Sequence, residues 1–338
     1  MQGNYIGTDV SGTADLGNSL DGVVIFAAPN NTIGGTTAGA GNIISGNRFR
    51  GVQIFSLGAR GTQVQGNFIG TDVNGTADLG NAGSGVVIAG PPNNTVGGAS
   101  PSARNIISGN DGGGVVIEGN RARGNQVLGN FIGTDVNGTA DLGNSLDGVQ
   151  IFDAPNNAIG GTTPGARNVI SGNNGNGVAI NGSLATESQV QGNYIGTDVS
   201  GTRDLGNSHD GVLISSAPSN TIGGAAAGAG NIISGNGFIG VRILSPGASG
   251  TQVQGNYIGT DVNGTADLGN SLGGVQIFDA PNNTIGGTTP GARNVISGNK
   301  HHGVQIIGSG ATETQVQGNY IGTDLTGMVA LATPATAF

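Results

Sequence analysis

The sequence predicts an all-β fold, a right-handed parallel β-helix of five 63-residue repeats with two coils in each repeat. Two periodicities support this prediction. A Gly-Thr-Asp triplet recurs at a constant spacing, and a Gly-Val pair divides each repeat into a 29-residue coil and a 34-residue coil. A fixed period of this length without insertions is typical of a solenoid. The aspartates that mark the long period are Asp9, Asp72, Asp135, Asp198, Asp261 and Asp324.

Each coil contains three short apolar segments that we expect to be strands. In one type of coil they read GVxI, NTIGG and NIISGN, and in the other GVxI, TQVQG and NFIGTD. Each segment has about four to six residues, is β-branched with period-two alternation, and is bounded by Gly, Asn or Pro. Glycine at this density would destabilise helices by roughly 1 kcal/mol per residue relative to alanine. Ten coils stacked about 4.8 Å apart would make a rod roughly 50 Å long.

The alternation within the strands predicts the side chains of the core. Val52, Ile54, Val64 and Ile69 should point inward, with their counterparts in other coils stacked on them. The asparagines of the GN and SGN segments should lie at bends, where an amide can bond to the backbone or to the next asparagine in the stack. We therefore expect internal asparagine ladders rather than ligand sites at Asn47, Asn67, Asn110, Asn130 and their equivalents.

The periodicity also predicts the domain organisation. Residues 1–324 should form one β-helix domain, and residues 325–338 a C-terminal cap or junction segment, because the loop pattern breaks at Leu325. An exposed end strand would otherwise template another chain. The sequence starts in the middle of a repeat without a visible secretory signal, so we expect a chain excised from a longer protein, or a built one.

Composition excludes several classes of function. The chain has no cysteine, which excludes disulfides, thiolate metal sites and a cysteine nucleophile. A net charge of -9 with a single lysine argues against nucleic acid and anionic membranes as partners. No apolar run approaches the length of roughly 18 residues that a membrane-spanning helix needs, so we expect no membrane insertion.

A catalytic site would have to break the repeat, because a substrate needs one arrangement of unlike groups. Lys300-His301-His302 and His209 with Asp210 are such departures, and we interpret both as surface turns rather than acid/base groups or ligands. Asp153 with Arg167, and Asp279 with Arg293, are expected to form surface ion pairs worth under about 1 kcal/mol. No Ser-His-Asp set stands out, so we predict no catalytic residues.

The acidic loop after the third strand is a tentative calcium site. Its side-chain oxygens recur at every second residue, much as in calcium loops. The alternative is that its aspartates cap turn amides through Asx-type bonds. Calcium is the only cofactor that the sequence suggests. The candidate ligands are Asp72, Asn74, Asp78, Asp135, Asn137, Asp141, Asp261, Asn263 and Asp267.

Outward positions of the strands form a predicted apolar stripe. A stripe this long is unusual on a soluble monomer. Either the inserted loops fold back over it, or it is an interaction surface for a second copy or for a glycan. Its third-strand members are Tyr5, Phe68, Phe131, Tyr194, Tyr257 and Tyr320. Its first-strand members include Phe26, Phe55, Phe152 and Phe278.

Two blocks of sequence resemble a known repeat family. Asn157-Ala158-Ile159-Gly160-Gly161 with Gly165-Ala166-Arg167-Asn168-Val169-Ile170-Ser171-Gly172-Asn173, and Asn67-Phe68-Ile69-Gly70-Thr71-Asp72, are similar to repeats of large bacterial surface and secreted proteins. That family belongs to the pectate-lyase-like, right-handed β-helix group, and the resemblance covers residues 1 to about 325. It implies an extracellular or cell-surface location. The Arg or Lys base with calcium-binding acids of the group's lyases, and the three aspartates with a histidine of its galacturonases, are not recognisable in this sequence.

These observations together favour a structural function. We expect a non-catalytic extracellular rod that acts as a stalk, an adhesin segment or a self-assembling filament subunit. Its partner would be a second copy, bound head-to-tail or laterally, or a cell-surface glycan. The alternative is a polysaccharide-binding protein or a polysaccharide lyase or glycoside hydrolase on the same fold, because a fold alone does not determine function.

Overall fold

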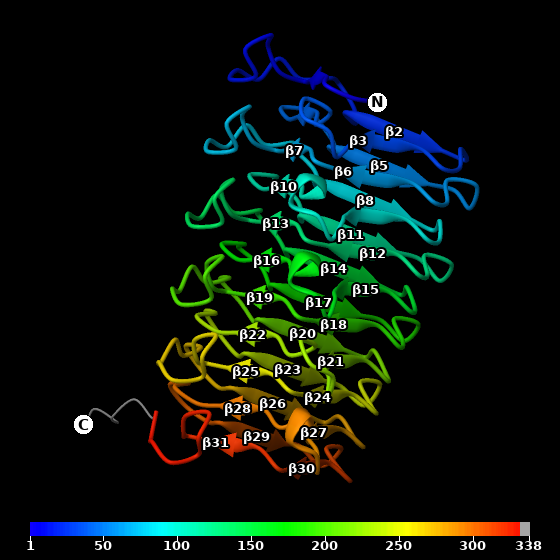
Figure 1. Cartoon of the computed structure of the whole chain (residues 1–338). Coiled ribbons are helices and arrows are strands. Elements are labelled where there is room, and N and C mark those ends of the chain that lie inside the picture. Colours follow the sequence, from blue (N-terminus) through cyan, green and yellow to red (C-terminus); the bar gives the residue numbers. More distant parts are fainter. Residues whose placement is uncertain (332–338) are drawn as a thin grey trace.

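The computed structural model describes residues 1–331 and confirms the right-handed parallel β-helix. Short strands wind into stacked coils, and the chain advances steadily from one end of the stack to the other (Figure 1). Apart from three short 3-10 turns, residues 1–331 contain no helix. None of the described elements is therefore a helix that could cross a bilayer.

The strands form three parallel sheets, one along each side of the coil. The first sheet contains β2 (Val23–Phe26), β5 (Val52–Phe55), β8 (Val86–Ala89), β11 (Val115–Glu118), β14 (Val149–Phe152), β17 (Val178–Asn181), β20 (Val212–Ser215), β23 (Val241–Leu244), β26 (Val275–Phe278) and β29 (Val304–Ile307). The second contains β3 (Thr32–Gly34), β6 (Gln63–Gln65), β9 (Thr95–Gly97), β12 (Gln126–Leu128), β15 (Ala158–Gly160), β18 (Gln189–Gln191), β21 (Thr221–Gly223), β24 (Gln252–Gln254), β27 (Thr284–Gly286) and β30 (Gln315–Gln317). The third contains β1 (Tyr5–Ile6), β4 (Ile43–Ile44), β7 (Phe68–Ile69), β10 (Ile106–Ile107), β13 (Phe131–Ile132), β16 (Val169–Ile170), β19 (Tyr194–Ile195), β22 (Ile232–Ile233), β25 (Tyr257–Ile258), β28 (Val295–Ile296) and β31 (Tyr320–Ile321). The 3-10 turns are η1 (Pro101–Ala103), η2 (Pro164–Ala166) and η3 (Pro290–Ala292).

The core is a stack of valine and isoleucine, as the alternation predicted. Val52, Ile54, Val64 and Ile69 are fully buried. Val52 pairs in register with its equivalent in the next coil, and the same registration holds in all three sheets. Because like side chains stack on like, each interior coil buries the same apolar cross-section.

The strands have two to four residues and are shorter than the expected four to six. The reason is the backbone that follows each of them. After β7, Gly70 has φ of +89°, and a Cβ there would lie 2.2 Å from the Ser108 carbonyl oxygen. Only glycine tolerates both the left-handed conformation and this close approach, so the chain turns there.

Asparagine ladders line the corners, which confirms the interpretation of the GN and SGN segments. Asn67 Nδ2 donates to Asn105 Oδ1 at 3.0 Å, and Asn105 Nδ2 donates to Asn130 Oδ1 at 2.9 Å. At another corner Asn47 Nδ2 donates to Asn81 Oδ1 at 2.8 Å. All five amides are buried, so the ladders satisfy polar groups that the turns remove from water.

The acidic loops form a stack of their own outside the third sheet. In each loop a turn begins at the aspartate of Gly-Thr-Asp. A β-bridge, such as the one between Thr71 and Asp78, closes the turn. The last loop follows the same path, with a bridge from Thr323 to Ala330. The expected boundary after residue 324 stays a prediction, and residues 332–338 of the expected cap lie outside the described residues.

Candidate functional site

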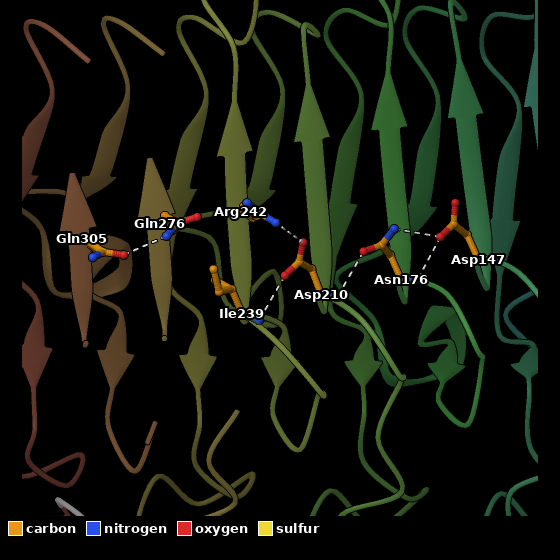
Figure 2. Close-up of polar contacts among 7 residues, drawn as sticks. All are labelled: Asp147, Asn176, Asp210, Ile239, Arg242, Gln276 and Gln305. Carbon is orange, nitrogen blue, oxygen red and sulfur yellow. Dashed lines mark hydrogen bonds and ion pairs between the residues drawn. The ribbon is translucent and has the colours of Figure 1, made fainter. Parts of the chain in front are cut away.

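The repeat departs from its own pattern chiefly along the outer face of the first sheet. The residue before each Gly-Val pair varies from coil to coil, and so does the outward residue that follows the valine. Figure 2 draws Ile239 and six polar members of this set, which we call the polar row: Asp147, Asn176, Asp210, Arg242, Gln276 and Gln305. Unlike groups brought together on one face are what a binding or catalytic site requires, so this row is the candidate site.

Hydrogen bonds join the polar row along the axis of the rod (Figure 2). Both the backbone nitrogen and Nδ2 of Asn176 donate to Asp147 Oδ1 at 2.8 Å. The backbone nitrogen of Asp210 donates to Asn176 Oδ1 at 3.1 Å, and that of Ile239 donates to Asp210 Oδ1 at 3.0 Å. Further along, Gln276 Nε2 donates to Gln305 Oε1 at 2.7 Å. The row is therefore ordered by contacts between successive coils.

Asp210 and Arg242 are the charged centre of the row. Arg242 Nη1 lies 3.8 Å from Asp210 Oδ2, the only ion pair among residues 1–331. Burial raises the pKa of the Asp210 carboxyl, and the Ile239 amide, Arg242 and His209 offset this only in part. Arg242 Nε is buried without a hydrogen-bond partner in the described structure. A buried carboxyl with a raised pKa and an unsatisfied donor are features that often mark functional sites.

Two hollows open on the same face, one on each side of this pair. The larger, about 430 Å³, is lined by Ser84, Asp147, Gln150 and His209 among others. His209 lies edge-on to Phe238 with ring centroids 5.4 Å apart. The smaller hollow, about 180 Å³, is lined by Gln276, His301, His302 and Gln305 among others.

The histidines lie on exposed turns, as the sequence indicated. Lys300, His301, His302 and His209 are all exposed. Sequence reasoning missed that His209, His301 and His302 line hollows next to the polar row. The repeat register could have indicated these positions. It places the three histidines one or two residues before a Gly-Val pair, and each Gly-Val pair leads into a strand of the first sheet.

The acidic loops use their aspartates to hold turn amides. Asp72 Oδ1 accepts hydrogen bonds from the backbone nitrogens of Thr76 at 2.8 Å and Ala77 at 3.0 Å. Asp72 Oδ2 accepts one from Asn74 Nδ2 at 3.0 Å, and Asp78 Oδ1 accepts one from the Gly80 amide at 2.8 Å. Burial raises the pKa of Asp72, but these hydrogen bonds outweigh it and the net pKa is lowered. The Asx-type alternative thus accounts for the contacts of Asp72 and Asp78.

The equivalent loops repeat this geometry. Asp135 and Asp261 accept the same two backbone amides and the side-chain amides of Asn137 and Asn263. Asp141 differs, because burial raises its pKa. Asp267 accepts a hydrogen bond from the Gly269 amide at 2.8 Å. Residues 1–331 contain no group of three or more acidic or histidine side chains that could hold a metal ion, and calcium binding stays a prediction.

The third-sheet part of the apolar stripe is covered by the chain's own loops at its centre. Phe131 is 2% exposed and Tyr194 is 6% exposed, so neither ring is available as an interaction surface. Both pack in a cluster with Ile106, Val169 and Ile232. Phe68, Tyr257 and Tyr320 are partly covered, and Tyr5 at one end of the row is exposed.

The first-sheet members of the stripe remain at the surface. Phe152 is 48% exposed, and Phe26 and Phe278 are exposed as well. Phe26 contacts the partly buried Phe55, with ring centroids 4.6 Å apart. These four rings stand at the ends of their strands, and an interaction role for them stays a prediction.

The expected ion pairs of Arg167 and Arg293 are wrong. Their guanidinium groups stack instead on Tyr194 and Tyr320, with 4.1 Å from Cζ to the ring centroid in both cases. Asp153 and Asp279 accept hydrogen bonds from backbone amides of the following coil. Both carboxylates are only partly exposed and already accept backbone hydrogen bonds, whereas each ring face attracts a cation.

No side chain of His209, His301 or His302 makes a hydrogen bond in residues 1–331. What the face does offer is a set of planar donors and acceptors around the two hollows. That chemistry suits binding of a polar ligand.

Comparison with known proteins gives only distant similarities. No protein family and no curated protein sequence matches this chain. Among solved structures it is similar to the periplasmic alginate epimerase AlgG, with 15% identity and a TM-score of 0.34 over 82% of this chain and 44% of that one. It is also similar to the A-modules of the Azotobacter vinelandii mannuronan C-5 epimerases AlgE4 and AlgE6. For AlgE4 the identity is 13% and the TM-score 0.37, over 83% of this chain and 56% of that one. For AlgE6 they are 17% and 0.39, over 87% and 76%. The matched part thus spans less than half of AlgG, and similarities of this size say nothing about activity.

Proposed function

We propose that this chain is a non-catalytic structural module, a stiff extracellular rod that serves as a stalk, an adhesin segment or a filament subunit. The observation that carries this proposal is the register of the three sheets, which pair coil upon coil without a slip or an insertion. Each interior coil buries the same core and continues the same asparagine ladders. An array of this kind holds its two ends at a fixed separation.

The filament version needs a second copy as the partner. In the last described coil, the inward side chains Ile306, Val316 and Ile321 are exposed, and further coils or a second copy would bury them. A head-to-tail contact that does not close generates a fibre. Sedimentation and negative-stain imaging at high protein concentration test this version. Filaments support it, and a monodisperse monomer contradicts it.

A second candidate function is glycan binding at the polar row. It is favoured by the two hollows, whose linings combine carboxylate, amide and imidazole groups with an adjacent phenyl ring. Planar polar groups around a concavity suit the hydroxyl groups of a sugar. Titration calorimetry with oligouronates tests it, with Asp147→Ala and His301→Ala as the variants.

The same oligouronates distinguish binding from catalysis. If the chain binds them without changing their length or composition over long incubation, the result supports glycan binding. It does not support the enzymatic alternative. Cleavage or a change of sugar composition that the two variants abolish would contradict the non-catalytic proposal. Absence of binding at millimolar sugar would remove the second candidate and leave the rod.

A further inference from the structure

Three of the five repeats fill a site over a third-sheet ring with their own arginine. The guanidinium lies 4.0 to 4.1 Å from the ring centroid, and its Nε donates to a glycine carbonyl at 2.9 to 3.2 Å. The three sets are Arg104, Phe131 and Gly129; Arg167, Tyr194 and Gly192; and Arg293, Tyr320 and Gly318. Three repeats of the chain thus show that this position binds a guanidinium group.

Two repeats lack the arginine. Gly41 and Gly230 occupy its position in the repeat, one coil before Phe68 and Tyr257. The same inserts also lack the proline that starts each 3-10 turn in the other three repeats. These two rings therefore have no guanidinium of their own above them.

Cavities open where the arginine is missing. One of about 430 Å³ is lined by Gly41, Gly66 and Phe68 among others, and one of about 460 Å³ by Gly230, Gly255 and Tyr257. Gly66 and Gly255 correspond to the glycines whose carbonyls accept the arginine Nε elsewhere. Neither carbonyl accepts a hydrogen bond within residues 1–331. Each cavity therefore offers a partly exposed ring beside a carbonyl that accepts no hydrogen bond in the described part of the chain.

The surrounding charge favours a cation. The chain carries a net charge of -9, and Asp261 is close enough to Tyr257 to help burial raise the pKa of its hydroxyl. Arg293 lies at the edge of the same cavity. Arg293 lies one repeat, or two coils, after Gly230. The two internal arginines Arg104 and Arg167 are separated by the same two coils, so two cations can occupy positions this far apart. About 10 Å of separation is comparable to a Debye length, so salt weakens the repulsion.

We propose that the cavities over Phe68 and Tyr257 each bind the arginine side chain of a partner protein. The guanidinium would stack on the ring and donate to the carbonyl of Gly66 or Gly255, as the internal arginines do at their own rings. The two sites are three repeats or six coils apart, so they lie roughly 29 Å from each other on the same side of the rod. This binding does not depend on whether the rod is a stalk or a filament.

Ring NMR signals of the four tyrosines provide the test, because the chain contains its own control. On titration with N-acetyl-L-arginine amide, the Tyr257 ring signals should shift with saturation in the millimolar range. The Tyr194 signals should not shift, because Arg167 already covers that ring. N-acetyl-L-lysine amide at equal concentration should shift Tyr257 much less, because it lacks the planar fork.

Two variants reverse the pattern. Replacing residues 225–230 by the Thr-Thr-Pro-Gly-Ala-Arg sequence of residues 162–167 should fill the Tyr257 site and abolish its response. The whole insert is exchanged because a Cβ on Gly230 alone would lie 1.9 Å from the Gly255 carbonyl oxygen. The converse variant, R167G, should make Tyr194 respond.

Several results would overturn the proposal. These are no shift of Tyr257, equal shifts of Tyr257 and Tyr194, or equal effects of the arginine and lysine compounds. A response to free L-arginine without one to the capped form would mean that the ligand is the amino acid and not a side chain. A Tyr257 response that survives the insert exchange would place the binding elsewhere.

Discussion

Replacement of Asn130 by alanine should destabilise the rod strongly, because this amide lies within a buried ladder. Asn130 Oδ1 accepts hydrogen bonds from the backbone nitrogen of Asn105 at 3.2 Å and from its Nδ2 at 2.9 Å. Asn130 Nδ2 donates to the Val96 carbonyl at 2.9 Å and to Asn168 Oδ1 at 3.2 Å. Alanine removes all four contacts at a position without solvent access.

The magnitude follows from the groups left without partners. The Asn105 amide loses its acceptor, and so does one hydrogen of its side-chain nitrogen. A buried donor left without an acceptor costs about 1–3 kcal/mol, so Asn130→Ala should lower the free energy of unfolding by about 2–4 kcal/mol. Urea unfolding followed by far-UV circular dichroism measures this difference.

Asn74→Ala is the matched control. Asn74 is exposed and donates only to Asp72, so its loss should change the free energy of unfolding by no more than about 0.5 kcal/mol. If Asn130→Ala were as mild as Asn74→Ala, the ladder would be a consequence of the coil rather than one of its supports.

Three further predictions concern the apolar stripe, the polar row and calcium. Phe131→Ala should cost about 3–5 kcal/mol of unfolding free energy, because it empties a buried ring site. The half-exposed Phe152→Ala should cost under about 1 kcal/mol, and equal losses in urea unfolding would contradict the burial argument. Asp210→Asn should stabilise the chain at pH 7, since the raised folded pKa means that the ionised carboxyl costs stability above it. This gain should shrink as the pH falls through the folded pKa and the wild-type carboxyl is protonated, and a loss of stability at pH 7 would refute the sign. If the acidic loops bind calcium, the melting temperature should be higher in calcium than in chelator, and identical melting curves would dismiss that prediction.

The fold was accessible from the sequence because its physical determinants are local and repeated. Val52 and Ile54 show their inward direction by alternation, and Asn67 shows its corner by the glycine beside it. Since every coil makes the same contacts, one correct assignment applies to all of them. The expected strands are longer than the observed ones because the segment NFIGTD includes Gly70. Only the positive φ of Gly70 shows that the turn begins there.

The candidate site was less accessible because it depends on which unlike residues adjoin across coils. His209 and Asp147 are separated by almost a full repeat of sequence, and neither is unusual within its own turn. The sequence predicts a carboxylate partner for Arg167 because charge is visible in a sequence, whereas the ring face of Tyr194 that Arg167 covers is not. The residues of the insert decided that choice, because only inserts with a proline and an arginine place a guanidinium over the ring.

The growth of the rod with added repeats tests the central claim most directly. Duplicating one complete repeat, residues 66–128, once, twice and three times within the chain inserts two coils per copy. Small-angle X-ray scattering should then show the maximum dimension rising by about 10 Å per copy, with an unchanged cross-section. A maximum dimension that grows only as a compact body does, together with a widening cross-section, would contradict an uninterrupted parallel β-helix.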